Sequence, residues 1–168
     1  MIIRQATVDD AAGVAAVMNH VIGEGQFTLF DRPFSVDDER SFLASLGARS
    51  AVFVAQDDSS IVGVQSLDLY SSMATSMSHV ATMGTWLTQP ARGRGIGRRL
   101  AVESFRFAKL CGYRKIVIQV LAGNERALRF YSSLGFTRVG IAREHVSLNG
   151  FFHDEVLMEK HLPSARQL

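Results

Sequence analysis

A run of alternating glycine and basic residues, QPARGRGIGRRL from Gln89 to Leu100, is the segment of this sequence best suited to chemistry. Its glycines occupy every second position, at Gly93, Gly95 and Gly97, and a helical pattern follows them. Backbone N–H groups at a helix start attract anions because the helix dipole places ~+0.5 charge there, and glycine lets a phosphate approach closely. The pattern therefore predicts a site for a phosphate-bearing ligand.

Two familiar phosphate-binding motifs do not fit this run. Arg98 stands where the dinucleotide fingerprint requires its third glycine, and the Gly-Lys-Ser/Thr of a P-loop is missing. What remains is Arg-x-x-Gly-x-Gly, formed by Arg92, Gly95 and Gly97. Taken alone, a glycine cluster of this kind is more often a flexible basic turn that binds no ligand.

The flanking segments decide between these readings. GTWLTQP precedes the run, NERALRFYSSLGF follows it, and the chain closes with LNGFFHDEVLMEK. In this order and at this separation, the motifs resemble those of the GCN5-related N-acetyltransferase (GNAT) family, and the resemblance extends from Ile2 to His161. It is closest to the phosphinothricin and amino-acid N-acetyltransferase branch. The resemblance implies an enzyme, an acetyl-CoA-dependent N-acetyltransferase.

The same resemblance implies a set of residues that bind the cofactor acetyl-CoA. The N–H groups of the glycine run would cradle the pyrophosphate, with added charge from Arg92 or Arg94, and the Leu87 N–H would lie near the thioester oxygen. Asn124 would contact the cofactor, although its position suits a helix N-cap equally well. The full predicted set is Leu87, Thr88, Arg92, Gly93, Arg94, Gly95, Ile96, Gly97, Arg98, Asn124, Ala127 and Tyr131.

The catalytic groups are less clearly marked. Tyr131 matches the family's tyrosine that protonates the leaving thiolate, for which a phenol of pKa ~10 is suited, although it is also placed as a core aromatic. Family members often use a glutamate of the fourth strand as the base, but HVATMGTWLT carries no carboxylate. His79, Glu24 and Asp68 are the remaining candidates, and a chain of waters is the alternative. Cys111 has no histidine spaced to activate it, which argues against a thiol nucleophile.

The resemblance places the acceptor pocket among three segments, at residues 24–34, 71–78 and 148–154. We expect Glu24, Phe27, Phe30 and His153 to line it, and we expect no metal. The favoured acceptor is a small primary amine such as an amino acid or an analogue of one. A peptide or polyamine acceptor, or a non-catalytic acyl-CoA sensor, stays open.

The remaining patterns predict the elements that carry these residues. Capping boxes at Thr7 and Ser35 start two helices, and Phe42, Leu43 and Leu46 are expected to face inward from the second. The expected order is β-α-α-β-β-β-α-β-α-β-β. This order predicts a mixed rather than wholly parallel sheet in an α/β (α+β) fold. The resemblance implies that the fold is of the GNAT type, with a mostly antiparallel sheet flanked by about four helices. By the resemblance, this sheet should splay between its fourth and fifth strands.

Length and composition limit the number of domains and the classes of partner. The chain has 168 residues, of which 47% are hydrophobic, so we expect one domain over residues 1–168. The 18 basic and 16 acidic residues give a net charge of +2, which favours neither nucleic acid nor a membrane as a partner. The start MIIRQATVDD does not resemble a signal peptide, so a cytoplasmic location is expected. The family often forms homodimers, and this remains possible here.

Overall fold

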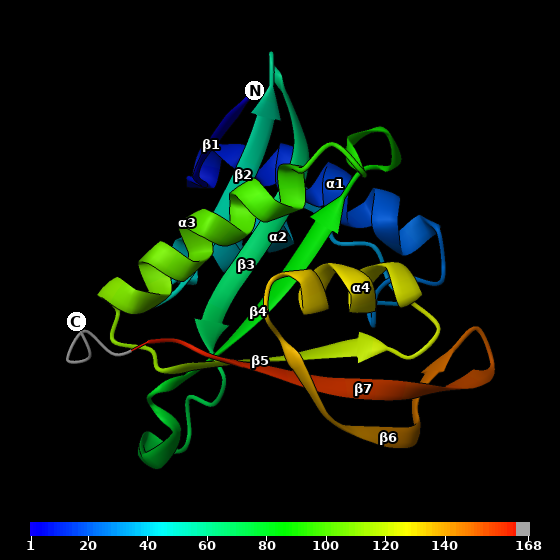
Figure 1. The fold of residues 1–168 in the computed structure, drawn as a ribbon. Helices are drawn as coiled ribbons and strands as arrows, with labels where there is room; N and C mark the ends of the chain where they lie inside the picture. The colour runs from blue at the N-terminus through cyan, green and yellow to red at the C-terminus, as the bar shows by residue number, and fades with distance from the viewer. Residues whose placement is uncertain (164–168) are drawn as a thin grey trace.

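A mixed sheet forms the centre of the structure, a computed structural model that describes residues 1–163. The end of the predicted domain, residues 164–168, lies outside the described residues. Within the described part, the seven strands follow the order β1-β2-β3-β4-β5-β7-β6 (Figure 1). β4 and β5 pair in parallel, and every other neighbouring pair is antiparallel. The sheet is therefore mixed and mostly antiparallel, as predicted.

The elements follow the predicted order. The strands are β1 (Ile2–Gln5), β2 (Ala51–Asp57), β3 (Ser60–Leu69), β4 (Val80–Leu87), β5 (Lys115–Leu121), β6 (Thr137–Leu148) and β7 (Phe151–His161). The α-helices of residues 1–163 are α1 (Ala11–Gly23), α2 (Val36–Ser45), α3 (Ile96–Leu110) and α4 (Glu125–Ser133). Short 3-10 helices occupy Val8–Asp10, Thr75–Met77 and Gln89–Ala91.

Helices cover both faces of the sheet, and β2 shows why. Alternate residues of a strand point to opposite faces. Val52 and Val54 pack with α1 and α2, whereas Phe53 packs with Ile96 and Leu100 of α3. Figure 1 accordingly shows α3 in front of the sheet and α1 and α2 behind it. The glycine run thus leads into a helix that is anchored on the sheet.

The helix ends follow the sequence signals, but one prediction about a buried face does not hold. The Ser35 hydroxyl accepts a hydrogen bond from the Asp38 N–H at 3.1 Å, and Gly112 ends α3 with a φ of +76°. The prediction for Phe42 was wrong, since its side chain is 41% exposed while that of Leu43 is 7% exposed. One residue of rotation on a helix, about 100°, separates the two. α2 buries a narrow stripe that excludes Phe42.

The sheet opens between β4 and β5. The two strands pair only at Val80 with Lys115, Ala81 with Ile116 and Thr82 with Val117. β4 continues beyond Thr82 to Leu87, and β5 continues to Leu121, but these parts of the two strands do not pair with each other. Figure 1 shows the two strands diverging there. Backbone groups along this opening are free to bind a ligand. This confirms the splay that the resemblance implied.

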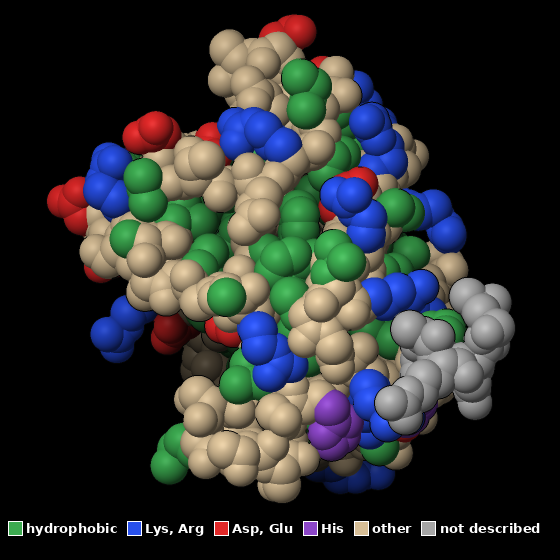
Figure 2. All heavy atoms as spheres, turned by 90° about the vertical axis from the view of Figure 1, so that its left-hand side faces the viewer, with side chains coloured by type: hydrophobic (Ala, Val, Ile, Leu, Met, Phe, Trp, Pro, Cys, Tyr) green, Lys and Arg blue, Asp and Glu red, His purple; other side chains and the backbone are tan. Residues whose placement is uncertain are grey.

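The surface charge is mixed. On the face shown in Figure 2, basic side chains are interspersed with hydrophobic, acidic and other polar atoms. This face therefore offers no continuous basic surface of the kind that binds a nucleic-acid backbone. Over residues 1–163, none of the helices combines the length and the apolar character needed to cross a membrane.

Candidate active site

A cavity of about 450 Å³ lies at the opening of the sheet, between the N-terminus of α3 and helix α4. It collects ten of the predicted cofactor-binding residues: Leu87, Arg92, Gly93, Gly95, Ile96, Gly97, Arg98, Asn124, Ala127 and Tyr131. Thr88 and Arg94 do not line it. The Thr88 N–H donates to the Val62 carbonyl at 3.1 Å, and Arg94 is 53% exposed beside Asp57.

The loop before α3 has the geometry of an anion site. From Gly93 to Arg98, the backbone N–H groups make no hydrogen bond to any described residue. Gly93 and Gly95 have φ values of +78° and +75°, which favour glycine, and a Cβ on Gly95 would meet nothing within 4 Å. Several adjacent free donors at a helix N-terminus suit a pyrophosphate, so the loop fits the cofactor that the motifs imply.

Arg92 holds this loop in place. Its Nε donates to the Leu87 carbonyl at 3.0 Å, and its Nη2 lies 2.9 and 2.7 Å from the two carboxylate oxygens of Glu24. The guanidinium also stacks over Phe27, 5.1 Å from the ring centre. The Nε and Nη2 donors of Arg92 are therefore bonded within the protein and are not free to bind a phosphate. Arg92 nevertheless lines the cavity, and its contribution of charge to the pyrophosphate stays a prediction.

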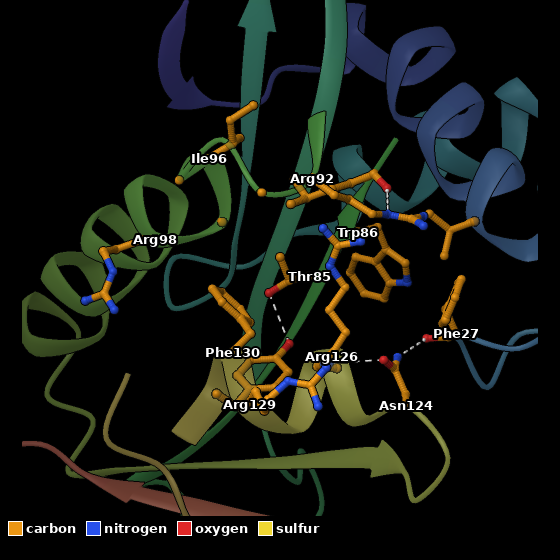
Figure 3. A pocket seen from close by; sticks show the side chains of 17 residues that line it. Phe27, Thr85, Trp86, Arg92, Ile96, Arg98, Asn124, Arg126, Arg129 and Phe130 are labelled. Atoms are coloured by element: carbon orange, nitrogen blue, oxygen red, sulfur yellow. Dashed lines mark hydrogen bonds between the residues drawn. The ribbon is translucent and has the colours of Figure 1, made fainter. Parts of the chain in front are cut away.

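Other arginines place further positive charge at the cavity. Arg98 projects from α3, while Arg126 and Arg129 project from α4 on the other side of the cavity (Figure 3). Arg129 also pairs with the exposed Glu125 at 2.9 Å. Sequence reasoning missed Arg126 and Arg129. Their separation of three residues directly after Asn124 places them on one helix face, a signal that was available.

Asn124 has the N-cap role that its position suggested. Its Oδ1 accepts a hydrogen bond from the Ala127 N–H at 3.0 Å, and its Nδ2 donates to the Phe27 carbonyl at 3.3 Å. The side chain is 8% exposed and lines the cavity. Asn124 thus starts α4 and fixes the loop that carries Phe27, which places both at the cavity wall (Figure 3).

Tyr131 is buried at the inner end of the cavity. Its hydroxyl donates to Thr85 Oγ1 at 3.0 Å, and the side chain is 6% exposed. Burial raises the pKa of Tyr131 to about 12, against hydrogen bonding with Thr85 that lowers it. The phenol therefore keeps its proton at neutral pH and is available as a proton donor. It also packs against Phe130 and Phe136, so both predicted roles are structurally compatible.

A second cavity of about 250 Å³ adjoins the first. Both cavities are lined by Phe27, Thr85, Trp86, Asn124, Ala127 and Tyr131. Phe30 contributes only to the second, where its ring lies 6.1 Å from Trp86. None of the described residues that line this cavity is acidic. It is an aromatic chamber that meets the first cavity at Tyr131.

Gln119 of β5 is a polar residue that lines the second cavity. Its Nε2 donates to Glu155 Oε2 at 2.9 Å, and Glu155 is 4% exposed. His145 Nε2 lies 3.7 Å from the same oxygen. Sequence reasoning missed Gln119, which belongs to no motif, and Trp86, whose motif GTWLTQP does not show which side chains face a cavity. A polar residue within the otherwise apolar run IVIQVL, residues 116–121, was the signal for Gln119.

The candidate bases line neither cavity. Glu24 is bound to Arg92, with His20 at 3.3 Å. His79 precedes β4 at the end opposite to Leu87, and Asp68 accepts hydrogen bonds from Ser50 and from the Leu69 N–H. His153 is exposed on β7, opposite Val146 of β6. None of these four residues lines either cavity, and their roles as a base or as acceptor contacts stay predictions.

Comparisons with known proteins agree with this geometry. The profile of the Acetyltransferase (GNAT) family matches residues 16–136. The chain is 26% identical to the L-amino acid N-acyltransferase MnaT of Escherichia coli, over 81% of this chain and 79% of the relative. It is also 26% identical to the L-methionine sulfoximine/L-methionine sulfone acetyltransferase of Salmonella typhimurium, over 82% of this chain and 80% of the relative.

Solved structures share the fold. A phosphinothricin acetyltransferase from Sinorhizobium meliloti in complex with AcCoA superposes with a TM-score of 0.90 at 19% identity, covering 99% of this chain and 91% of that one. The chain belongs to the GNAT family of acetyltransferases. It is an acyltransferase, and acetyl-CoA, the donor used by this family, is the cofactor that the motifs predicted.

Proposed function

We propose that this protein transfers an acetyl group from acetyl-CoA to the primary amine of an amino acid or a close analogue. The observation that carries the proposal is the meeting of the two cavities at Thr85 and Tyr131. One cavity has anion-binding N–H groups and arginines, and the other has aromatic walls. A donor and an acceptor bound side by side react directly, in a ternary complex and without an acyl-enzyme.

Each wall of the first cavity has a defined task in this proposal. The N–H groups from Gly93 to Arg98 hold the pyrophosphate, and Arg98, Arg126 and Arg129 add charge. Acetyl-CoA supplies the activated acyl group as a thioester. Leu87 lies beyond the last β4–β5 pair, where its backbone N–H is the proposed donor to the thioester oxygen.

Tyr131 is the proposed general acid. Its proton-bearing phenol lies where the two cavities meet, and burial keeps it protonated. Removing the hydroxyl in Tyr131→Phe should lower kcat by about 100-fold while leaving the Kd for acetyl-CoA within about twofold. An unchanged kcat would remove Tyr131 from this role.

The second cavity favours an amino acid over a polyamine. A polyamine carries several positive charges and needs acidic partners, whereas the described residues that line this cavity include no carboxylate. Trp86, Phe27 and Phe30 suit an apolar or sulfur-containing side chain, and Gln119 offers a polar contact. The names of the Escherichia coli and Salmonella typhimurium relatives support the same acceptor class.

Calorimetry with acetyl-CoA, followed by thiol release on the same sample, tests the proposal. The acceptor panel holds L-methionine sulfoximine, L-methionine sulfone, proteinogenic amino acids, spermidine and N-terminal peptides. Selective turnover of the amino-acid analogues is the expected result. Preference for peptides or spermidine would replace the acceptor class, and binding without any turnover would favour a sensor.

A further inference from the structure

The hydroxyl of Thr85 receives two side-chain hydrogen bonds. Gln65 Nε2 donates to it at 2.8 Å, and the Tyr131 hydroxyl donates to it at 3.0 Å, which is the dashed line at Thr85 in Figure 3. Gln65 lies on β3 directly opposite Thr85, while Tyr131 comes from α4. The three side chains form a polar line from the centre of the sheet to the point where the cavities meet.

The chemistry of these groups restricts where protons can go. A threonine hydroxyl has one O–H to donate and two lone pairs that accept. In this structure both acceptor positions are filled, and no described residue accepts the Thr85 proton. The amide NH₂ of Gln65 cannot accept it. With the amide of Gln65 in this orientation, the hydrogen bond between Thr85 and Tyr131 is therefore the one of the two that can reverse.

Gln65 occupies a position where an apolar residue would serve folding better. Its side chain is fully buried, and its Oε1 has no hydrogen-bond partner among the described residues. A buried carbonyl without a partner lowers stability, and such exceptions call for an explanation. Among the described residues, the one hydrogen bond of the Gln65 side chain is to Thr85. Its position therefore points to a role in orienting that hydroxyl.

We propose that Thr85, oriented by Gln65, reverses its hydrogen bond to Tyr131 and so stabilises the phenolate that forms when Tyr131 acts as an acid. The inference rests on the proposed function. As the thioester C–S bond breaks, the O–H bond of Tyr131 breaks and its proton goes to the leaving sulfur. The electron pair stays on Tyr131 Oη, Thr85 donates its O–H to that oxygen, and solvent later returns a proton. Thr85 and Gln65 are positioning residues.

The ionisation of Tyr131 gives a test that does not depend on turnover. The chain has three tyrosines, so fluorotyrosine labelling gives a small set of fluorine NMR signals, and Tyr131→Phe assigns the one of interest. Fluorination also lowers the phenol pKa into an accessible range. Thr85→Val should raise this pKa by about one unit, Gln65→Leu by less, and Thr85→Ser should restore it. Thr137→Val, at an exposed strand threonine that lines neither cavity, is the matched control.

Kinetics on the same variants separate a positioning role of Thr85 from a general loss of structure. Thr85→Val should lower kcat by about tenfold and leave the calorimetric Kd for acetyl-CoA within about twofold. In a Tyr131→Phe background, Thr85→Val should cause no further loss, because its effect passes through the phenol. A further tenfold loss in that background, or an unchanged ionisation of Tyr131 in Thr85→Val, would overturn the inference.

A failure of the proposed function would give different results from a failure of the inference about Thr85. If the wild-type protein binds no acetyl-CoA or acetylates no amine of the panel, the proposed function fails, while the fluorine titration still reports on the link between Thr85 and Tyr131. If wild-type turnover is present and Thr85→Val changes neither ionisation nor kcat, only the inference fails. If Thr85→Val does not fold, Gln65→Leu and Thr85→Ser decide on the same two readouts.

Discussion

Both carboxylate oxygens of Glu24 contact one nitrogen of Arg92, at 2.9 and 2.7 Å, across 68 residues of sequence. Glu24 follows the end of α1, and Arg92 begins the glycine run, so this contact joins the loop that carries Phe27 and Phe30 to the proposed phosphate site. The aromatic chamber and the anion site are thereby held in one arrangement.

Loss of this contact should weaken the fold. Both side chains are largely buried, at 19% and 14% exposed, so Glu24→Ala leaves a charged guanidinium with one partner fewer. We expect the free energy of unfolding to fall by about 1–2 kcal/mol, and by less in Glu24→Gln. Glu125→Ala breaks an ion pair of 77% and 72% exposed side chains and should change it by less than about 0.5 kcal/mol. Equal losses in urea denaturation would contradict this account.

Asp10 should make the free energy of unfolding depend on pH. Arg4 binds it through two hydrogen bonds of 2.7 Å, and these hold the pKa of Asp10 at about 2. Since the folded pKa lies below the unfolded one, the contribution is complete above about pH 4 and is lost as pH falls toward about 2. Asp10→Asn should therefore lower the free energy of unfolding by roughly 1–2 kcal/mol near neutral pH, because solvent screens part of the interaction.

The check is a series of urea denaturations of wild type and Asp10→Asn at decreasing pH. The two stabilities should converge as the pH approaches about 2. The exposed neighbour Asp9 provides the control variant Asp9→Asn, which should follow the wild-type curve. A constant difference at every pH would show that Asp10 acts through its shape rather than its charge.

Local signals in the sequence were enough to predict the helices and strands. They also predicted the loop of free backbone N–H groups that forms part of the candidate site. The caps at Ser35, the glycine at Gly112 and the run from Gly93 act within a few residues, so the pattern contains their whole cause. The partners of Arg92 could not be foreseen, because its contact to Glu24 depends on how two loops meet in space. For the same reason Thr85, Trp86 and Gln119 were not recognised.

Gly95 should be essential for the cofactor and not for the fold. Gly95 and Gly112 share the same backbone conformation, with φ values of +75° and +76°, and a Cβ at either position would meet no atom within 4 Å. Glutamate at either position therefore introduces similar strain, but only Gly95 lines the cavity. Calorimetry should detect no acetyl-CoA binding to Gly95→Glu and near wild-type binding to Gly112→Glu. Equal affinities would place the pyrophosphate elsewhere.

Gly84 should matter because of Trp86. The indole lies across Gly84, so a Cβ there would be 2.2 Å from Trp86 Cη2. Gly84→Ala must therefore displace a side chain that lines both cavities. Trp86 is the single tryptophan of the chain, so its fluorescence reports the movement directly. We expect a shifted emission spectrum and an acceptor KM raised by about tenfold, whereas Gly140→Ala, at an open strand position, should change neither.

Gln119 provides the sharpest test of where the acceptor lies. The carboxylate of Glu155 is an acceptor, which fixes the amide NH₂ of Gln119 toward it at 2.9 Å and leaves the amide oxygen as the group that can accept from an amine. Gln119→Leu removes that oxygen and also leaves Glu155 with one hydrogen bond fewer, so a modest loss of stability of about 1–2 kcal/mol should accompany it.

The expected kinetic effect of Gln119→Leu is confined to the acceptor. The KM for the preferred amine should rise by about tenfold, because one hydrogen bond to a charged group is lost, while the Kd for acetyl-CoA stays within about twofold. Gln5→Leu, on an exposed residue of β1, controls for the change of residue type. An unchanged KM in Gln119→Leu, together with a raised KM in Gly84→Ala, would place the amine against the aromatic wall and away from β5.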